Sequence, residues 1–214
     1  QSRVLDIGCG SGSMVYKFSE EGICAIGIEH DSLEIKFGKS IGLDLRKCSI
    51  EQLEQEEDFD LVIMSHSLEH CDNVGQTLDI IYKILALGGH FFVATPNRED
   101  IITLPHKDIM RSLTLPHVFG FTLQSLTNLL GKHSFKLIAS ERGKRGVHMN
   151  ALFKKNSKSI GYISDYEKIE KMLRSLEKKR FLNMPYMYSE AKLHSYDLRQ
   201  KIGLTHLSQK LGFK

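Results

Sequence analysis

Residues 4–12 read VLDIGCGSG, the most informative pattern in the sequence. An apolar run of strand character leads into glycines at every second position, and a helical pattern follows. Glycine is needed where the backbone takes a positive φ or lies against a ligand, so this turn indicates a bound small molecule. A dinucleotide site would need a glycine at position 13, which is Ser13 here. Asp6 would repel a pyrophosphate, so the turn suits a cationic ligand better.

The sequence around this turn alternates short apolar runs with longer helical patterns, from Arg3 to Phe153. Such alternation predicts βαβ units and an α/β fold of the Rossmann-like, doubly wound type with a mostly parallel sheet. We expect strands at residues 4–7, 24–29, 61–65, 90–95, 136–140 and 149–154, and helices at 14–20, 32–39, 74–87 and 123–132. The Gly88-Gly89 pair is expected to end the third of these helices.

Composition places the chain among globular proteins with one ordinary core. Its 214 residues are 41% hydrophobic and 26% charged, which excludes disordered, collagen-like and disulfide-scaffold classes. No apolar run reaches the roughly 18 residues of a membrane span, and the four cysteines have no C-x-x-C spacing. We therefore expect a cytoplasmic protein. Because the regular pattern starts directly after Gln1, we also expect that further chain precedes it.

Charge divides the chain into two parts. Residues 1–154 carry 16 basic and 20 acidic residues, a balance of −4, whereas residues 155–214 carry 13 and 6, a balance of +7. An apolar stripe among lysines and glutamates predicts an amphipathic helix, formed by Tyr166, Ile169, Met172, Leu173 and Leu176. Ser164 and Glu167 form a capping-box pattern at its start, and a second candidate helix covers residues 189–201. We predict a domain at 1–154 and a basic helical extension at 155–214. A solvated lysine-rich helix face is the commoner explanation of such a charge, and contact with nucleic acid or a membrane surface is the alternative. The extension would cover the domain, pair two chains as a homodimer or belong to a longer protein.

The glycine turn, as D-x-G-x-G-x-G after an apolar strand, resembles motif I of class I S-adenosylmethionine (SAM) dependent methyltransferases. Further motifs similar to those of this family follow in order: FDLVI at 59–63, SHSLEH at 65–70, LGGHFFVATPN at 87–97 and PHVFGFT at 116–122. The last one resembles a segment of a broad subgroup that includes many small-molecule and sugar methyltransferases. The resemblance covers residues 3–154 and implies the class I fold, SAM as the cofactor and methyl transfer as the activity. The helix that normally precedes motif I is absent from this sequence.

The resemblance also implies the cofactor-binding residues. Glu29 ends the second expected strand, where a carboxylate can accept hydrogen bonds from both ribose hydroxyls. Family members usually have an aspartate after the third strand to accept from the adenine amino group, and Ser49 stands there in this sequence, a weaker acceptor by about 1 kcal/mol. The complete expected set is Asp6, Gly8, Gly10, Gly12, Glu29, His30, Ser49, Ile50 and Ser65.

Two histidines are candidates for a catalytic base. Methyl transfer to a hydroxyl requires an aligned nucleophile and removal of its proton, and histidine suits that task near neutral pH. His66 follows the fourth expected strand at the sheet edge where ligands bind, and His117 comes from a loop at 98–117 that we expect to hold the substrate. His66, Glu69 and His70 also have a metal-ligand spacing, and some ubiquinone-pathway O-methyltransferases carry a metal-binding acid-x-x-Glu-His here. We predict base catalysis without a metal.

The sequence lacks the motifs of several classes of methyltransferase, which narrows the possible methyl acceptors. The segment after the fourth expected strand lacks the D/N-P-P-aromatic clamp of nucleic-acid amino-methyltransferases, and no Pro-Cys nucleophile is present, which argues against a nucleic-acid substrate. A protein-arginine enzyme would need paired acids, and only Glu69 is in that neighbourhood. We predict a methyltransferase that acts on a small-molecule or glycan hydroxyl. The alternative is a catalytically weak SAM-fold module that binds a partner or nucleic acid through its basic C-terminal helices; the intact motif I favours the enzyme.

Overall fold

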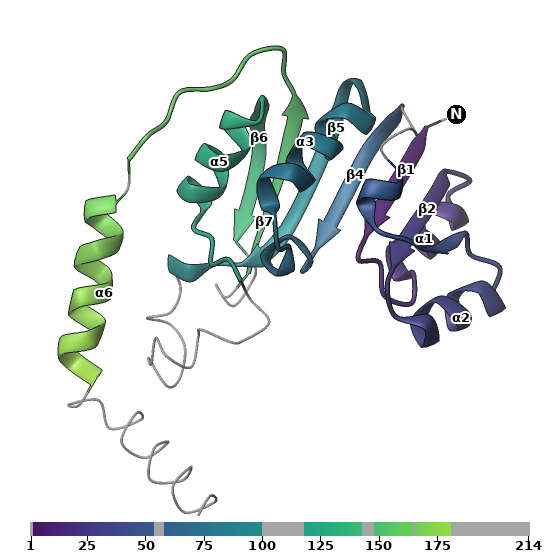
Figure 1. Cartoon of the computed structure of the whole chain (residues 1–214), viewed down its shortest axis with the longest axis horizontal. Coiled ribbons are helices and arrows are strands. Elements are labelled where there is room, and N and C mark those ends of the chain that lie inside the picture. Colours follow the sequence, from purple (N-terminus) through teal and green to yellow (C-terminus); the bar gives the residue numbers. More distant parts are fainter. Residues whose placement is uncertain (1, 54–57, 100–117, 143–147, 165, 181–214) are drawn as a thin grey trace, which may run out of the picture. The chain divides into compact units, whose positions relative to one another are not determined.

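A computed structural model of the 214-residue chain describes residues 2–53, 58–99, 118–142, 148–164 and 166–180 (Figure 1). The chain divides into two compact units. The first comprises residues 1–100 and 113–165, and the second comprises residues 101–112 and 166–214. Of the second unit, the structure describes the helix α6 (Tyr166–Arg180).

A seven-stranded sheet forms the centre of the first unit, with the order β3-β2-β1-β4-β5-β7-β6 (Figure 1). Its strands are β1 (Arg3–Ile7), β2 (Cys24–Glu29), β3 (Leu45–Lys47), β4 (Phe59–Ser65), β5 (Leu85–Pro96), β6 (Phe135–Arg142) and β7 (His148–Lys155). Strand β7 is antiparallel to its neighbours β5 and β6, and the other neighbouring pairs are parallel. The predicted Rossmann-like α/β fold with a mostly parallel sheet is confirmed.

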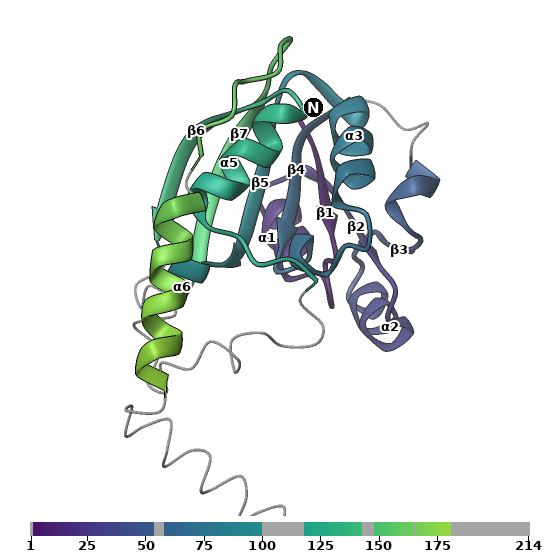
Figure 2. The same cartoon turned by 60° about the vertical axis from the view of Figure 1, so that its left-hand side comes forward.

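Helices cover both faces of this sheet because strand side chains alternate between two cores. The helices are α1 (Ser13–Glu20), α2 (Ser32–Ser40), α3 (Val74–Ile84) and α5 (Leu123–Lys132), with 3-10 helices η1 (Ile50–Leu53) and η2 (Leu68–His70). Leu5 and Val62 belong to the core shared with α3 and α5, whereas Val4 and Ile63 belong to the core shared with α1 and α2. Figure 2 shows α3 and α5 on one side of the sheet and α1 on the other.

The third helix ends earlier than predicted. Helix α3 stops at Ile84, and Leu85 takes an extended conformation (φ −74°, ψ 135°) that begins β5 directly. Leu85 is 2% exposed and pairs with Phe59 of β4, so burial and sheet pairing outweigh the helical period of this stretch. The prediction that Gly88-Gly89 ends the helix is therefore wrong, since both glycines lie within β5.

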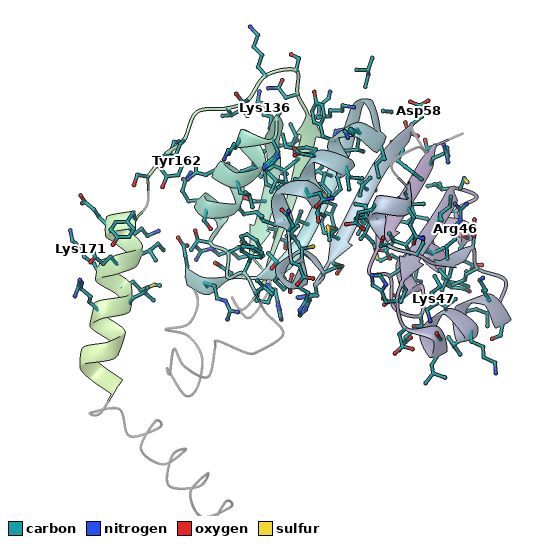
Figure 3. The ribbon with its side chains drawn as sticks, viewed as in Figure 1. Arg46, Lys47, Asp58, Lys136, Tyr162 and Lys171 are labelled. Carbon is teal, nitrogen blue, oxygen red and sulfur yellow. The ribbon has the colours of Figure 1, made fainter. Side chains whose placement is uncertain are left out.

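The segment after β7 is fastened to α5. The Ile160 N–H donates to the carbonyl oxygen of Gly131 at 2.8 Å, and the side-chain amide of Asn128 bonds both the carbonyl and the N–H of Ile163, at 2.5 and 3.1 Å. Tyr162 projects from this segment and is 72% exposed (Figure 3). The predicted domain boundary after residue 154 remains a prediction, but these bonds attach residues 156–163 to the first unit.

Helix α6 shows the predicted apolar stripe only in part, because Tyr166 at its start is 65% exposed. Ile169, Met172 and Leu173 are half-buried, whereas Lys171 is exposed (Figure 3). Glu170 and Arg174 form an i,i+4 ion pair at 2.7 Å on the helix. The second candidate helix, at residues 189–201, lies outside the described residues. Within the part of the chain that the structure describes, no helix combines the length and apolarity required to cross a membrane.

Candidate functional site

The glycine turn after β1 is fastened to the end of β2. Gly8, Gly10 and Gly12 have φ values of 72°, 53° and 89°, a conformation that side-chain-bearing residues rarely adopt. The Gly8 N–H donates to the carbonyl oxygen of Ile28 at 2.9 Å, and the Gly10 N–H donates to Oε2 of Glu29 at 3.0 Å. The turn therefore holds the Glu29 carboxylate at the carboxyl edge of the sheet.

The glycines of this turn have different steric surroundings. A Cβ added at Gly12 would lie 2.8 Å from Cδ1 of Leu43, so this leucine side chain would have to shift to admit it. A Cβ at Gly8 would lie 2.7 Å from Oγ of Ser67. A Cβ at Gly10 would meet no atom of the described part of the chain within 4 Å. Packing therefore explains Gly8 and Gly12, whereas the bare backbone at Gly10 borders open space, as a ligand-binding turn requires.

Two carboxylates give this edge a negative potential. Burial raises the pKa of Glu29, but backbone hydrogen bonds from His30, Asp31 and Gly10 outweigh it and hold the pKa below its usual value. Asp6 is only 4% exposed. Burial, and then repulsion by Glu29, raise the pKa of Asp6 from 3.8 to about 6. The pair is therefore suited to a ligand that brings positive charge.

A cavity of about 610 Å³ opens beside this turn. Five of the predicted cofactor residues line it, namely Gly8, Glu29, His30, Ser49 and Ile50. Asp6, Gly10, Gly12 and Ser65 lie outside its lining, although the first three belong to the turn or the strand that leads into it. His70, which the sequence suggested only as a metal ligand, also lines the cavity, and so do four polar residues that no motif indicated, at the start of α3 and just before it: Asp72, Asn73, Gln76 and Thr77.

The loop after β3 forms a further part of the cavity wall. Lys47 pairs with Glu29 in the sheet, so Ser49 follows closely after the level of the Glu29 carboxylate. The Ser49 N–H donates to Oε1 of Gln52 at 2.8 Å. A hydrogen bond with the Ser49 side chain lowers the pKa of Glu51, which also lines the cavity. Ser49 thus stands where family members usually have an aspartate, and Glu51 lies two residues further along the chain.

His66 lies at the cavity in a strained backbone conformation. Its φ of 56° is unusual for a residue with a side chain. The conformation is held because the His66 N–H donates to the carbonyl oxygen of Ala94 at 2.8 Å, and the neighbouring Ser67 hydroxyl donates to the carbonyl oxygen of Ile7 at 2.7 Å. The His66 side chain is 46% exposed and lines the cavity. The predicted base is thus next to the glycine turn.

Glu69 and His148 surround the His66 ring. Glu69 is 1% exposed, and its Oε2 accepts a hydrogen bond from the Thr95 hydroxyl at 3.1 Å. Its Oε1 stands 3.5 Å from Nδ1 of His66. His148 meets the His66 ring edge-on, with ring centroids 4.9 Å apart and an interplanar angle of 88°. Sequence reasoning missed His148, although it begins β7, and an antiparallel strand starts at the edge where the parallel strands end.

The metal-ligand alternative does not assemble in the described residues. Among them, no three His, Cys, Asp or Glu side chains come together closely enough to hold a metal ion. The i,i+3,i+4 spacing assumed a helix, but His66 has a positive φ and precedes the three-residue 3-10 helix η2. His66, Glu69 and His70 therefore do not share one helical face. The other candidate base, His117, lies outside the described residues.

Comparisons with known proteins agree with this geometry. Residues 1–140 match the model of a methyltransferase domain family. The chain is 32% identical over 103 residues to the ubiquinone biosynthesis O-methyltransferase of Bradyrhizobium sp. (strain ORS 278), a match that covers 45% of this chain and 41% of that protein. It is 30% identical over 110 residues to the mitochondrial ubiquinone biosynthesis O-methyltransferase of Rattus norvegicus, which covers 46% and 32% of the two chains. The match thus spans less than half the length of these curated relatives.

Solved structures show the same fold. A SAM-dependent methyltransferase from Archaeoglobus fulgidus superposes with a TM-score of 0.61 at 22% identity, covering 72% of this chain and 86% of that chain. The family match covers well over half of the present chain and includes the glycine turn, Glu29 and His66. The chain therefore belongs to the class I methyltransferases, the family whose methyl donor is S-adenosylmethionine.

Proposed function

We propose that this chain catalyses transfer of a methyl group from SAM to a hydroxyl group of a small molecule or glycan, with His66 as the base. The observation that carries the proposal is one cavity wall that contains Gly8 and Glu29 together with a histidine backed by a buried acid. The two curated relatives described above are named O-methyltransferases, which supports a hydroxyl acceptor.

The residues of the glycine turn fit the cofactor. When bound, SAM supplies a methyl group on a positively charged sulfur. Glu29 would accept hydrogen bonds from the ribose hydroxyls, since its lowered pKa keeps it ionised at neutral pH. Asp6 and Glu29 together would favour the cation by their charge. Gly10 would let the cofactor approach the backbone, because among the described residues no atom lies within 4 Å of the position of a Cβ there.

His66 would remove the proton of the acceptor hydroxyl. A general base must come within hydrogen-bond reach of the proton that it takes, either directly or through one water. The 46% exposed His66 side chain borders the cavity, so its ring is accessible to a substrate. The backbone at His66 is held in place by Ala94, which limits the base to rotations of its side chain.

Labelled product identifies the acceptor class. The full chain is incubated with methyl-labelled SAM and a cell extract, and the labelled product is isolated and its methylated atom determined. A methyl ether supports the proposal, whereas a methylated amine or thiol contradicts it. With the identified acceptor, His66→Ala is expected to lower kcat by about 10² to 10⁴ while cofactor affinity stays unchanged.

A matched control and a second variant complete this test. His90→Ala changes a half-buried histidine that pairs with Leu61 near the opposite end of the parallel part of β5, so its kcat should stay near that of the unmodified chain. If His66→Ala keeps full activity, the role passes to His117, which His117→Ala then tests. Full activity in both variants would refute histidine base catalysis.

A further inference from the structure

The Glu69 carboxylate is buried with one oxygen left without a hydrogen bond. Its Oε2 is bonded to the hydroxyl of Thr95, a fully buried residue, but within the described residues its Oε1 has no hydrogen-bond partner. Buried polar atoms almost always have partners, and leaving one unpaired is costly. A buried acid in this state beside a candidate active site indicates a partner that engages when the site is in use.

His66 is positioned to be this partner. Its Nδ1 stands 3.5 Å from Oε1 of Glu69, only a few tenths of an ångström beyond an ordinary hydrogen bond. Catalytic hydrogen bonds are often long in ligand-free enzymes and shorten when substrate binds. Because the His66 backbone is held by Ala94 and the Glu69 carboxylate by Thr95, a small rotation of the imidazole is sufficient to form the bond.

The surroundings of His66 and Glu69 determine which ring nitrogen of His66 carries the proton. Arg98 is a charged neighbour of this pair: burial lowers the pKa of its guanidinium, and the charge of Glu69 acts in the opposite direction. A hydrogen bond in which Oε1 of Glu69 is the acceptor requires a proton on Nδ1 of His66. His148 contacts the same ring edge-on and restricts its rotation.

We propose that Glu69 is a positioning residue that holds His66 as its Nδ1-protonated tautomer, with Nε2 unprotonated and available to the acceptor. This inference rests on the proposed function. As the new oxygen–carbon bond forms and the carbon–sulfur bond breaks, the acceptor proton moves to Nε2, and the sulfur keeps the electron pair of the broken bond. The Nδ1 proton stays between His66 and Glu69, where the carboxylate stabilises the imidazolium.

The tautomer is measured by NMR on the full chain labelled with ¹⁵N-histidine, without any methyl acceptor. The His66 signals are assigned by their loss in His66→Gln. We expect the unprotonated ring nitrogen, which gives the far-downfield ¹⁵N signal, to be Nε2 in the unmodified chain. In Glu69→Gln, which keeps the side-chain shape and removes the charge, the downfield signal is expected to shift toward Nδ1. His148→Phe keeps an aromatic edge at the ring and is expected to leave the tautomer unchanged.

Two results would overturn the proposal: a His66 that is mainly Nε2-protonated in the unmodified chain, or an Nδ1-protonated ring that stays unchanged in Glu69→Gln. If Glu69→Gln does not fold, Glu69→Asp withdraws the carboxylate from the ring and must shift the tautomer in the same direction. Binding of S-adenosylhomocysteine serves as the fold control, because Glu69 is outside the expected cofactor set. Failure of the unmodified chain to bind this ligand would refute the proposed function while leaving the tautomer measurement intact.

Discussion

Replacing Asp6 by asparagine should make the ligand-free protein more stable and the cofactor complex weaker. Asp6 is 4% exposed, and burial followed by repulsion from Glu29 raises its pKa from 3.8 to about 6. The folded state therefore binds the Asp6 proton more tightly than the unfolded state does. A difference of about two pKa units corresponds to about 3 kcal/mol of folding free energy.

The sign of the pH dependence follows from this difference. Between pH 3.8 and about 6 the unfolded chain has lost the Asp6 proton while the folded chain still holds it, so stability falls as the pH rises through this window. Above about pH 6 the folded chain has also lost the Asp6 proton, so stability no longer falls on this account. Asp6→Asn carries no such proton, so we expect it to exceed the unmodified chain in stability by about 1 to 3 kcal/mol at pH 7.5, with an advantage that shrinks toward pH 4.

Urea unfolding of the two proteins from pH 4 to pH 8 measures this difference. The same samples are titrated with S-adenosylhomocysteine, whose ammonium group should make its affinity lower for Asp6→Asn, because the sheet edge beside the cavity loses a negative charge. A variant that is less stable than the unmodified chain at pH 7.5, by an amount that does not change with pH, would refute the reasoning. Unchanged ligand affinity would refute the part of the account that gives Asp6 a role in cofactor binding.

Three further predictions concern the turn, the tail and a metal. Gly10→Ala should reduce S-adenosylhomocysteine binding measured by calorimetry. The control is Gly42→Ala, which also has a positive φ, of 86°, and no described atom within 4 Å of its Cβ position, and this variant should bind normally. Equal losses of affinity in the two variants would indicate that backbone strain alone is the cause. Truncation after Ser164, which retains the bonds of residues 156–163 to α5, should leave this binding intact, and a folded fragment without binding would contradict the domain prediction. A chelator should leave methyl transfer unchanged, because the described residues form no three-ligand group, and activity that a divalent ion restores would revive the metal alternative.

The sequence predicted the fold because its strongest signals are local. The glycine turn, the apolar strands and the 3.6-residue period of Leu123–Lys132 each act over a few neighbouring residues, and α5 has the predicted bounds. The end of α3 was missed because long-range pairing of Leu85 with Phe59 decides it. The three-residue strand β3 is too short to give a period of its own.

The candidate site could be predicted only in part from the sequence. Its motifs located Gly8, Glu29 and His66, which the structure brings to one cavity. The contact of His148 with His66 depends on the antiparallel direction of β7, which no short motif carries. The burial of Glu69 could not be predicted either. The spacing of His66, Glu69 and His70 suggested one helical face, but the positive φ of His66 interrupts the helix.

We propose that the cavity beside the glycine turn holds the cofactor through Glu29. Binding of S-adenosylhomocysteine to the full chain is the direct measurement of this. Isothermal titration calorimetry should show one binding site for the unmodified chain, with an affinity that Glu29→Ala weakens by about 1 to 3 kcal/mol through lost charge-assisted hydrogen bonds. His90→Ala should bind as the unmodified chain does. No binding to the unmodified chain, or equal affinity in Glu29→Ala, would contradict the account.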